Sequence, residues 1–159
     1  GHTSCQCVLV ERNAKLFFCA DQVILGLVPI VITSGKDQHL LTEYFASLRE
    51  LASDYSGYRF LPGHYDEFTE IKEEADRIIA GYGERCTQLR QALAESNRPM
   101  TLLELDQALY IQRMQTYRYS FLFSYLHTWP KLFSCLDWLF ETGVIDRTEQ
   151  DGVLYWSLR

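Results

Sequence analysis

The sequence predicts a mixed α+β fold, and three observations lead to that prediction. Short β-rich segments and long amphipathic segments alternate over the first 96 residues, in the order strand, strand, helix, strand, helix. Further helical segments follow, and the chain ends in two short β-rich segments around a polar turn. At 159 residues, with 47% hydrophobic and 23% charged residues, the chain has the composition of a soluble globular protein. We therefore expect a sheet covered by helices, followed by a largely helical unit.

Three short segments are predicted strands. Residues 5–10 and 15–19 are β-rich and are separated by Glu11-Arg12-Asn13-Ala14, a polar segment of hairpin-turn length. Residues 58–61 form the third segment. It ends at Pro62-Gly63, a pair that breaks regular structure and forces a turn.

Two helices are predicted among these strands. Residues 38–54 carry apolar side chains at the spacing of an amphipathic helix, and residues 68–96 repeat that pattern over a longer range. Gly81 and Gly83 weaken the second helix by about 1 kcal/mol each relative to alanine, so we expect a kink there. Ser96-Asn97-Arg98-Pro99 ends this helix and marks a domain boundary.

The boundary divides the chain into a domain of residues 1–97 and a second domain of residues 98–159. Thr101 and Glu104 fit a capping box, in which each side chain accepts a hydrogen bond from a free N–H group at a helix start. The remaining elements are expected to be a helix over residues 119–127, a helix from Thr128 with Pro130 in its first turn and Gly143 just past its end, and strands on either side of Asp151-Gly152. Three helices followed by a β-hairpin is the order of a winged helix.

The charge and the apolar runs exclude several classes of function. A formal charge of −6 and a pI of about 5.2 argue against broad attraction to nucleic acid or to an anionic membrane. The longest apolar run, residues 23–32, contains a glycine and a proline and predicts a buried strand or loop. No apolar run reaches the roughly 18 residues that span a bilayer, and residues 1–10 lack the features of a signal peptide.

The cysteines indicate a reducing, cytoplasmic environment. Five of them, at positions 5, 7, 19, 86 and 135, do not make a disulfide framework. Cys5 and Cys7 would share a face of the first strand and could hold a metal ion, but no second cysteine pair completes a tetrahedral site. We therefore expect buried thiols rather than metal ligands.

Three polar residues lie at the ends of predicted strands: His2, Asp21 and His64. Strand ends are rigid, and the loops beyond them vary freely, so functional groups gather there. Imidazole and carboxylate are ligands of zinc, manganese and iron. The three residues are therefore candidate metal ligands, against the alternative that each histidine is an ordinary surface or core side chain.

The segments around these residues resemble a known family. Gly1-His2-Thr3 precedes one strand, Phe17-Phe18-Cys19-Ala20-Asp21 closes the next, and Phe60-Leu61-Pro62-Gly63-His64 closes the last. These segments and their order are similar to the second half of a metallo-β-lactamase-fold hydrolase, an αββα sandwich. The resemblance covers essentially the whole chain. It extends to the branch with a winged-helix-like C-terminal domain, which includes lactamase-like, lactonase-like and nuclease-like members.

The resemblance implies a role for each candidate residue. His2 would ligate the first of two divalent metal ions, zinc in the complete enzyme, Asp21 would bridge the two ions, and His64 would ligate the second. The implied reaction is attack of a metal-bound hydroxide on an ester, amide, thioester or phosphodiester bond of a small-molecule substrate. Replacing Asp21 by alanine in the complete enzyme would then abolish activity.

The sequence also departs from the family pattern. The family has Gly-His where this chain has Cys5-Gln6, and glycine where it has Ala20; a methyl group there is tolerable unless the backbone needs a positive φ. The principal H-x-H-x-D-H motif is not present in these 159 residues. We therefore expect part of a longer hydrolase, inactive by itself. Its partner would be the missing N-terminal half or a second copy, because an apolar sheet face would otherwise be exposed.

Other interpretations concern the second domain. We expect His127 to be a packed core histidine rather than a substrate or partner contact. Residues 117–125 alternate like a strand within a helical context, and either structure favours a core or dimer contact. The six basic and seven acidic residues of residues 98–159 argue against a winged helix that reads DNA. A packing module, or a non-catalytic interaction or structural fragment, is the alternative to a hydrolase.

Overall fold

The structure is a computed structural model that describes residues 2–3, 5–31, 38–111 and 124–159. Its strands are β1 (Leu9–Glu11), β2 (Leu16–Ala20), β3 (Arg59–Pro62), β4 (Ile145–Gln150) and β5 (Val153–Leu158). Its helices are α1 (Leu40–Asp54), α2 (Ile71–Ser96), α3 (Leu102–Ile111) and α5 (Trp129–Glu141), with a π-helical turn, η1 (Ser124–Thr128), directly before α5. Two compact units are formed, one by residues 1–31 and 40–82 and the other by residues 32–39 and 83–159.

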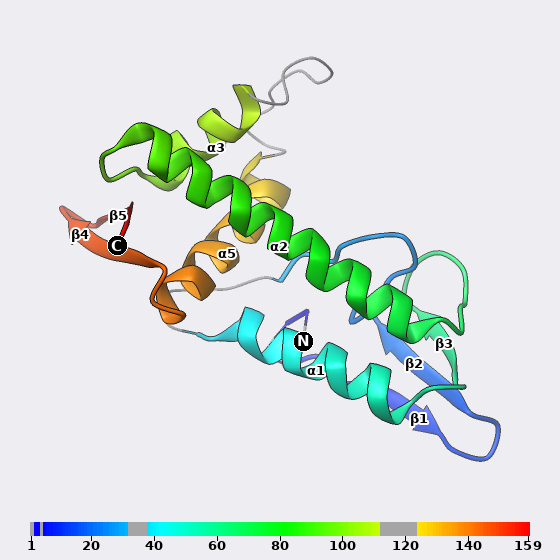
Figure 1. The fold of residues 1–159 in the computed structure, drawn as a ribbon. Coiled ribbons are helices and arrows are strands. Elements are labelled where there is room, and N and C mark those ends of the chain that lie inside the picture. Colours follow the sequence, from blue (N-terminus) through cyan, green and yellow to red (C-terminus); the bar gives the residue numbers. More distant parts are fainter. Residues whose placement is uncertain (1, 4, 32–37, 112–123) are drawn as a thin grey trace. The chain divides into compact units, whose positions relative to one another are not determined.

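The first unit contains a three-stranded sheet in the order β1-β2-β3 (Figure 1). Strands β1 and β2 are antiparallel, with Leu9 opposite Phe18. Strands β2 and β3 are parallel, with Phe18 opposite Leu61. The three predicted strands of this region are therefore confirmed, although β1 begins at Leu9 rather than near residue 5.

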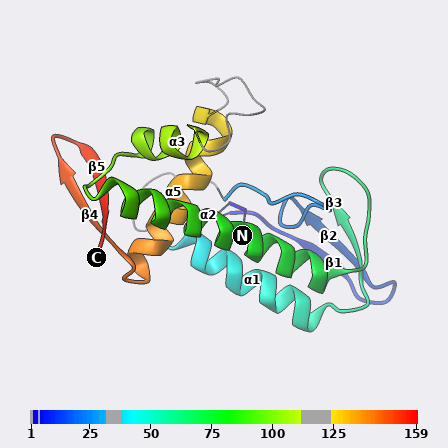
Figure 2. The same ribbon diagram turned by 45° about the horizontal axis from the view of Figure 1, so that its top comes forward.

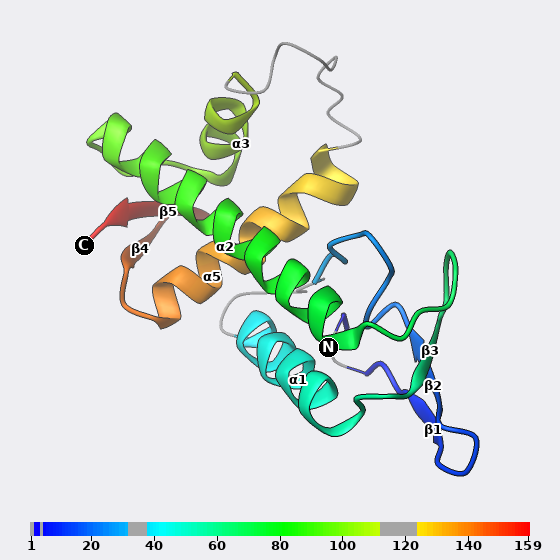
Figure 3. The same cartoon turned by 45° about the vertical axis from the view of Figure 1, so that its right-hand side comes forward.

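One face of this sheet is covered by helices. Phe17 and Phe60 point inward from neighbouring strands, are buried, and stack with ring centroids 4.8 Å apart. Tyr44 of α1 and Tyr82 of α2 meet edge to face with centroids 6.3 Å apart. The first half of α2 and the whole of α1 lie on the same side of the sheet (Figures 1 and 3). The apolar faces of the two predicted amphipathic helices therefore supply much of this core.

The opposite face of the sheet is apolar and open. Leu9 is 70% exposed and Phe18 is 44% exposed, and the two are cross-strand neighbours. Leu61 continues the row on β3 and is half-buried. Since side chains alternate between the faces of a strand, this row lies on the face that α1 and α2 do not cover.

The apolar run that follows β2 is an irregular segment, tied to α2. The Tyr82 hydroxyl donates to the Pro29 carbonyl at 2.7 Å and accepts from the Val31 N–H at 2.9 Å. Gly81 leaves room for Val28, since a Cβ at Gly81 would lie 2.7 Å from the Val28 side chain. Helix α2 runs without interruption from residue 71 to 96, across both glycines.

The second unit contains α3, α5 and a β4–β5 hairpin that directly follows α5 (Figure 2). Trp156 of β5 is buried and pairs through its backbone with Met100, just before α3. Helix α5 begins at Trp129 with a proline in its first turn and is followed by Gly143 at a φ of +73°. These features match the predicted start and end of this helix.

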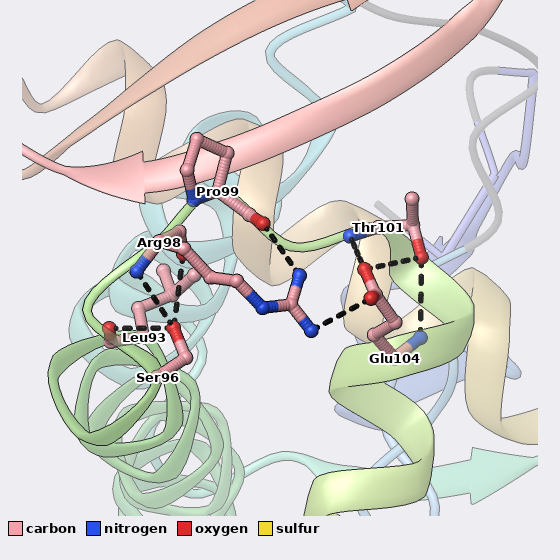
Figure 4. Close-up of polar contacts among 6 residues, drawn as sticks. All are labelled: Leu93, Ser96, Arg98, Pro99, Thr101 and Glu104. Carbon is pink, nitrogen blue, oxygen red and sulfur yellow. Dashed lines mark hydrogen bonds and ion pairs between the residues drawn. The ribbon is translucent and has the colours of Figure 1, made fainter.

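The start of α3 confirms the predicted capping box (Figure 4). The Thr101 N–H donates to the Glu104 carboxylate at 2.8 Å, and the Glu104 N–H donates to the Thr101 hydroxyl at 3.3 Å. Arg98 adds an ion pair to the same carboxylate at 2.8 Å. Mainly through the hydrogen bond from Arg98, the pKa of Glu104 is lowered below its ordinary value.

The structure also tests the predicted burial of the five cysteines and of His127. Cys5 and Cys7 are exposed, so the prediction that they are buried is wrong, whereas Cys19, Cys86 and Cys135 are buried as expected. His127 is exposed at the end of η1, and the packed-core prediction for it is wrong as well. The predicted helix over residues 119–127 and the alternating segment 117–125 lie mostly outside the described residues.

Among the helices that the structure describes, none combines the length and apolar character that a membrane crossing requires.

Candidate functional site

The parallel pairing of β2 and β3 brings two of the predicted residues together. Asp21 directly follows β2, and His64 lies two residues beyond the end of β3. The Gly63 N–H donates to the Ala20 carbonyl at 2.9 Å and ties the two strand ends to one another. His64 Nε2 lies 3.7 Å from Asp21 Oδ1, with the two side chains 66% and 33% exposed. The pairing of the two strands therefore places this imidazole and carboxylate at one edge of the sheet, partly open to solvent.

Gly63 leaves room for the Asp21 carboxylate in its present position. A Cβ at residue 63 would lie 2.8 Å from Asp21 Oδ1, closer than non-bonded atoms approach. Any larger residue would displace the carboxylate or the turn that carries it. The Pro-Gly-His segment thus has a local physical reason: proline ends the strand, glycine makes room for Asp21, and histidine follows.

Ala20 sits in a strained conformation beside Asp21. The pairing of β2 with β3 shifts register between Phe18 and Ala20, which is the signature of a bulge. Ala20 has a φ of +46°, in the left-handed region that costs an L-residue about 1 to 2 kcal/mol. Because the backbone at residue 20 has a positive φ, the methyl group of Ala20 carries a cost that a glycine would not have.

His2 is attached to the same turn through Gln22. The His2 N–H donates to Gln22 Oε1 at 3.1 Å, and the His2 Nδ1 atom is buried without a hydrogen-bond partner among the residues that the structure describes. Gln22 follows Asp21 in the chain, so His2 is anchored next to the predicted site. Sequence reasoning did not identify Gln22. Its only signal is a polar side chain at the start of an otherwise apolar run.

The nearby thiols are poor candidates for reactive groups. Cys19 is buried, and its Sγ lies 3.4 Å from the Val23 carbonyl, which accepts its hydrogen bond. Burial raises the pKa of Cys19 to about 11, so the thiol stays protonated at neutral pH. A protonated thiol is neither a nucleophile nor a metal ligand.

The donor types at this edge fit a divalent metal ion, but the number of donors does not. Asp21 and His64 supply a carboxylate and an imidazole, and the backbone of His2, whose Nδ1 has no partner in the described part of the chain, is tied to the adjacent Gln22. Within the described part of the chain, no group of three histidine, cysteine, aspartate or glutamate side chains is placed to hold an ion. A structural zinc site takes four protein ligands, and a catalytic site takes three. The described residues therefore make an incomplete site.

Two solved structures are similar to this chain. A metallo-beta-lactamase family protein from Thermus thermophilus matches with a TM-score of 0.77 and 19% identity, over 100% of this chain and 47% of its own. A beta-lactamase domain protein from Burkholderia ambifaria matches with a TM-score of 0.78 and 19% identity, over 97% of this chain and 44% of its own. The sequence matches no protein-family model and no curated protein.

These similarities show the fold of the chain. It is a mixed α+β structure with the metallo-β-lactamase fold, which confirms the coarser part of the sequence prediction. The chain spans less than half the length of either structure that it matches.

Proposed function

We propose that this chain contributes the C-terminal part of a metal-dependent hydrolase. The observation that carries the proposal is the approach of His64 to Asp21 at the ends of two parallel strands, in a chain with the metallo-β-lactamase fold. His2, anchored beside Asp21 by Gln22, is the third proposed ligand. In the complete protein these residues would bind two divalent metal ions, zinc in the first instance.

The chemistry proposed for the complete site is hydrolysis of an ester, amide, thioester or phosphodiester bond in a small-molecule substrate. Bound metal ions would lower the pKa of a water molecule and polarise the bond to be broken. The part of this chain is to hold carboxylate and imidazole groups at fixed positions on rigid strand ends. Gly63 and the bulge at Ala20 set the direction of the Asp21 carboxylate.

The open face of the sheet supports a partner for this chain. Leu9 and Phe18 are large apolar side chains that a soluble monomer would ordinarily cover. We propose that the missing N-terminal half covers this face in the complete hydrolase and supplies the remaining ligands. A second copy of the chain is the alternative occupant. The same face supports the second candidate function, a non-catalytic interaction fragment.

The second domain is proposed to be winged-helix-like, with its boundary between residues 97 and 98. Its role would be to pack against other protein rather than to bind nucleic acid, because Arg147, on the first strand of the hairpin, is buried in an ion pair. A cytoplasmic location remains part of the proposal, on the basis of the cysteine content.

Metal content tests the hydrolase proposal. Elemental analysis of the purified chain, with its intact mass, would be followed by titration with Zn²⁺ and with Co²⁺. We expect weak binding that is lost in Asp21→Asn and in His64→Gln, and unchanged in the matched control His127→Gln. Equal binding by all four proteins would contradict the proposed ligands.

The proposed partner face is tested by the oligomeric state. Light scattering after gel filtration would compare the wild-type chain with Phe18→Ser, and with Leu103→Ser, which replaces a similarly exposed apolar residue of α3 in the other unit. We expect self-association of the wild-type chain that Phe18→Ser reduces. A wild-type chain that is monomeric at high concentration would argue against an uncovered docking face.

A further inference from the structure

Gln22 is a buried residue that forms hydrogen bonds with three residues far from it along the chain. It is only 4% exposed. Its side-chain amide donates to the Ser47 hydroxyl of α1 at 2.7 Å, and its side-chain oxygen accepts from the His2 N–H at 3.1 Å. Its backbone carbonyl accepts from the Tyr44 hydroxyl at 2.8 Å. One residue thus connects helix α1, the turn after β2 and the segment that carries His2.

The hydrogen bonds of the Gln22 side chain are separate from those that hold the turn after β2. The turn itself is held by backbone contacts, because the Gln22 N–H donates to the Cys19 carbonyl at 2.9 Å and Tyr44 holds the Gln22 carbonyl. The side-chain amide is therefore not needed to form the turn. Its oxygen reaches out to a residue twenty positions earlier, which precedes β1. A buried amide is stable only when both its donor and its acceptor groups are satisfied, and here Ser47 and His2 do so.

We propose that Gln22 is the positioning residue that holds His2 beside Asp21. Its oxygen fixes the backbone of His2 to the turn that carries Asp21, and Ser47 fixes the orientation of the amide. This inference rests on the proposed function, because the position of His2 matters for chemistry only if His2 is a metal ligand. Its geometry can be tested without any metal.

Three substitutions separate the two ends of the amide. Gln22→Leu keeps the size of the side chain and removes both hydrogen bonds. Gln22→Glu keeps an oxygen acceptor for the His2 N–H, and the Ser47 hydroxyl can donate to the second oxygen. Ser47→Ala removes only the anchor on α1. Gln91→Leu is the control, because Gln91 is an exposed residue of the second unit that bonds Glu95 of the same helix at 2.8 Å.

The first measurement is hydrogen exchange of the His2 amide, followed by NMR in the chain without metal. We expect exchange to be about fivefold faster in Gln22→Leu, as the loss of one hydrogen bond predicts, and nearly restored in Gln22→Glu. Ser47→Ala should have an intermediate effect and keeps the test valid if Gln22→Leu does not fold. Exchange at His2 that is the same in all variants, Ser47→Ala included, would overturn the inference.

The second measurement is the visible absorption of bound Co²⁺, which reports its ligands. We expect Gln22→Leu to lower the apparent Co²⁺ affinity and Ser47→Ala to lower it less, with Gln91→Leu unchanged. If the exchange result holds but no variant, including the wild-type chain, binds Co²⁺, the positioning of His2 stands and the proposed metal function fails. If Co²⁺ binds equally to all variants, Gln22 does not act on the site and the inference is wrong.

Discussion

The two units of this chain handle their polar side chains in different ways. In the second unit, Arg147 and Asp137 form a buried ion pair at 2.8 Å, with side chains 9% and 7% exposed. In the first unit, Asp21 and His64 are 3.7 Å apart and partly open to solvent. The first pair is shielded from water, whereas the carboxylate and the imidazole at the strand ends remain partly hydrated.

Buried atoms without partners are present in both units, and they differ in kind. His2 Nδ1 in the first unit and Trp156 Nε1 in the second are buried and lack a hydrogen-bond partner in the described structure. The indole N–H sits in an apolar core, for which we have no physical account. The imidazole nitrogen belongs to a residue whose backbone N–H is bonded to Gln22, which follows Asp21 in the chain. A buried polar atom without a partner among the described residues is unusual and calls for an explanation.

The largest expected effect tests whether the second unit is held by its own charges. Arg147→Met removes the guanidinium group that pairs with the buried Asp137 carboxylate, so we expect the free energy of unfolding to fall by about 3 to 5 kcal/mol. Chemical denaturation measures it. Arg159→Met is the control, because Arg159 pairs with Asp146 at the surface and should contribute less than about 1 kcal/mol. Equal effects of the two substitutions would remove the contrast between the units.

A second prediction compares two glycines of α2 that fall in different units. Gly83 has open space around it, so Gly83→Ala should stabilise the chain by about 1 kcal/mol through helix propensity. Gly81 faces Val28, and Gly81→Ala should destabilise the first unit by about 1 to 3 kcal/mol through overpacking. Thermal unfolding of both variants measures the difference. Stabilisation by Gly81→Ala would mean that the segment after β2 is not packed on α2.

The capping box of the second unit supports a smaller prediction. Thr101→Ala should lower the free energy of unfolding by about 1 kcal/mol, because it removes the acceptor for the Glu104 N–H. Chemical denaturation at pH 7 measures this, with Thr87→Ala as an exposed helical control.

The stability that Glu104 contributes depends on pH, in a direction that follows from its lowered pKa. The folded-state pKa of Glu104 is lowered, so its contribution to stability is present above the ordinary value of about 4.3 and is lost as the pH falls through the folded-state value. Glu104→Gln should therefore flatten the acid side of the stability profile. An acid limb with unchanged slope would contradict the role of this ion pair.

The smallest predicted effect concerns the strain at Ala20 in the first unit. Ala20→Gly relieves the left-handed φ of +46° but makes the unfolded chain more flexible, so we expect a net gain of about 0.5 to 1 kcal/mol. Ala14→Gly, in the hairpin turn at a residue without a positive φ, should be neutral or destabilising. A loss of stability in both variants would show that Ala20 is not strained.

Much of the fold could be predicted from local patterns. The amphipathic spacing of residues 38–54 and 68–96 and the Thr101–Glu104 pair identified three helices close to their observed bounds. Strand positions were predicted within a few residues, apart from the late start of β1. Exposure of Cys5, Cys7 and His127 was not predicted, because burial depends on which segments of the chain pack above a residue.

The candidate site was predicted in part. The order of short segments ending in Asp21 and His64 indicated which residues to examine, but not that a bulge and a left-handed Ala20 lie beside them. Gln22 gave only a weak signal in the sequence, since a single polar residue at the start of an apolar run has no spacing to interpret. Its role depends on Ser47 and His2, which lie far from it along the chain.

The sequence by itself determined the elements, because helix periodicity, capping residues and the Pro-Gly pair act over a few neighbouring positions. It also determined the residue types available for chemistry at the strand ends. Only the tertiary structure decided that β2 and β3 pair in parallel, which brings the residues after them to one edge of the sheet. It also decided which face of the sheet α1 and α2 cover, because burial is a property of distant segments in contact rather than of any local pattern.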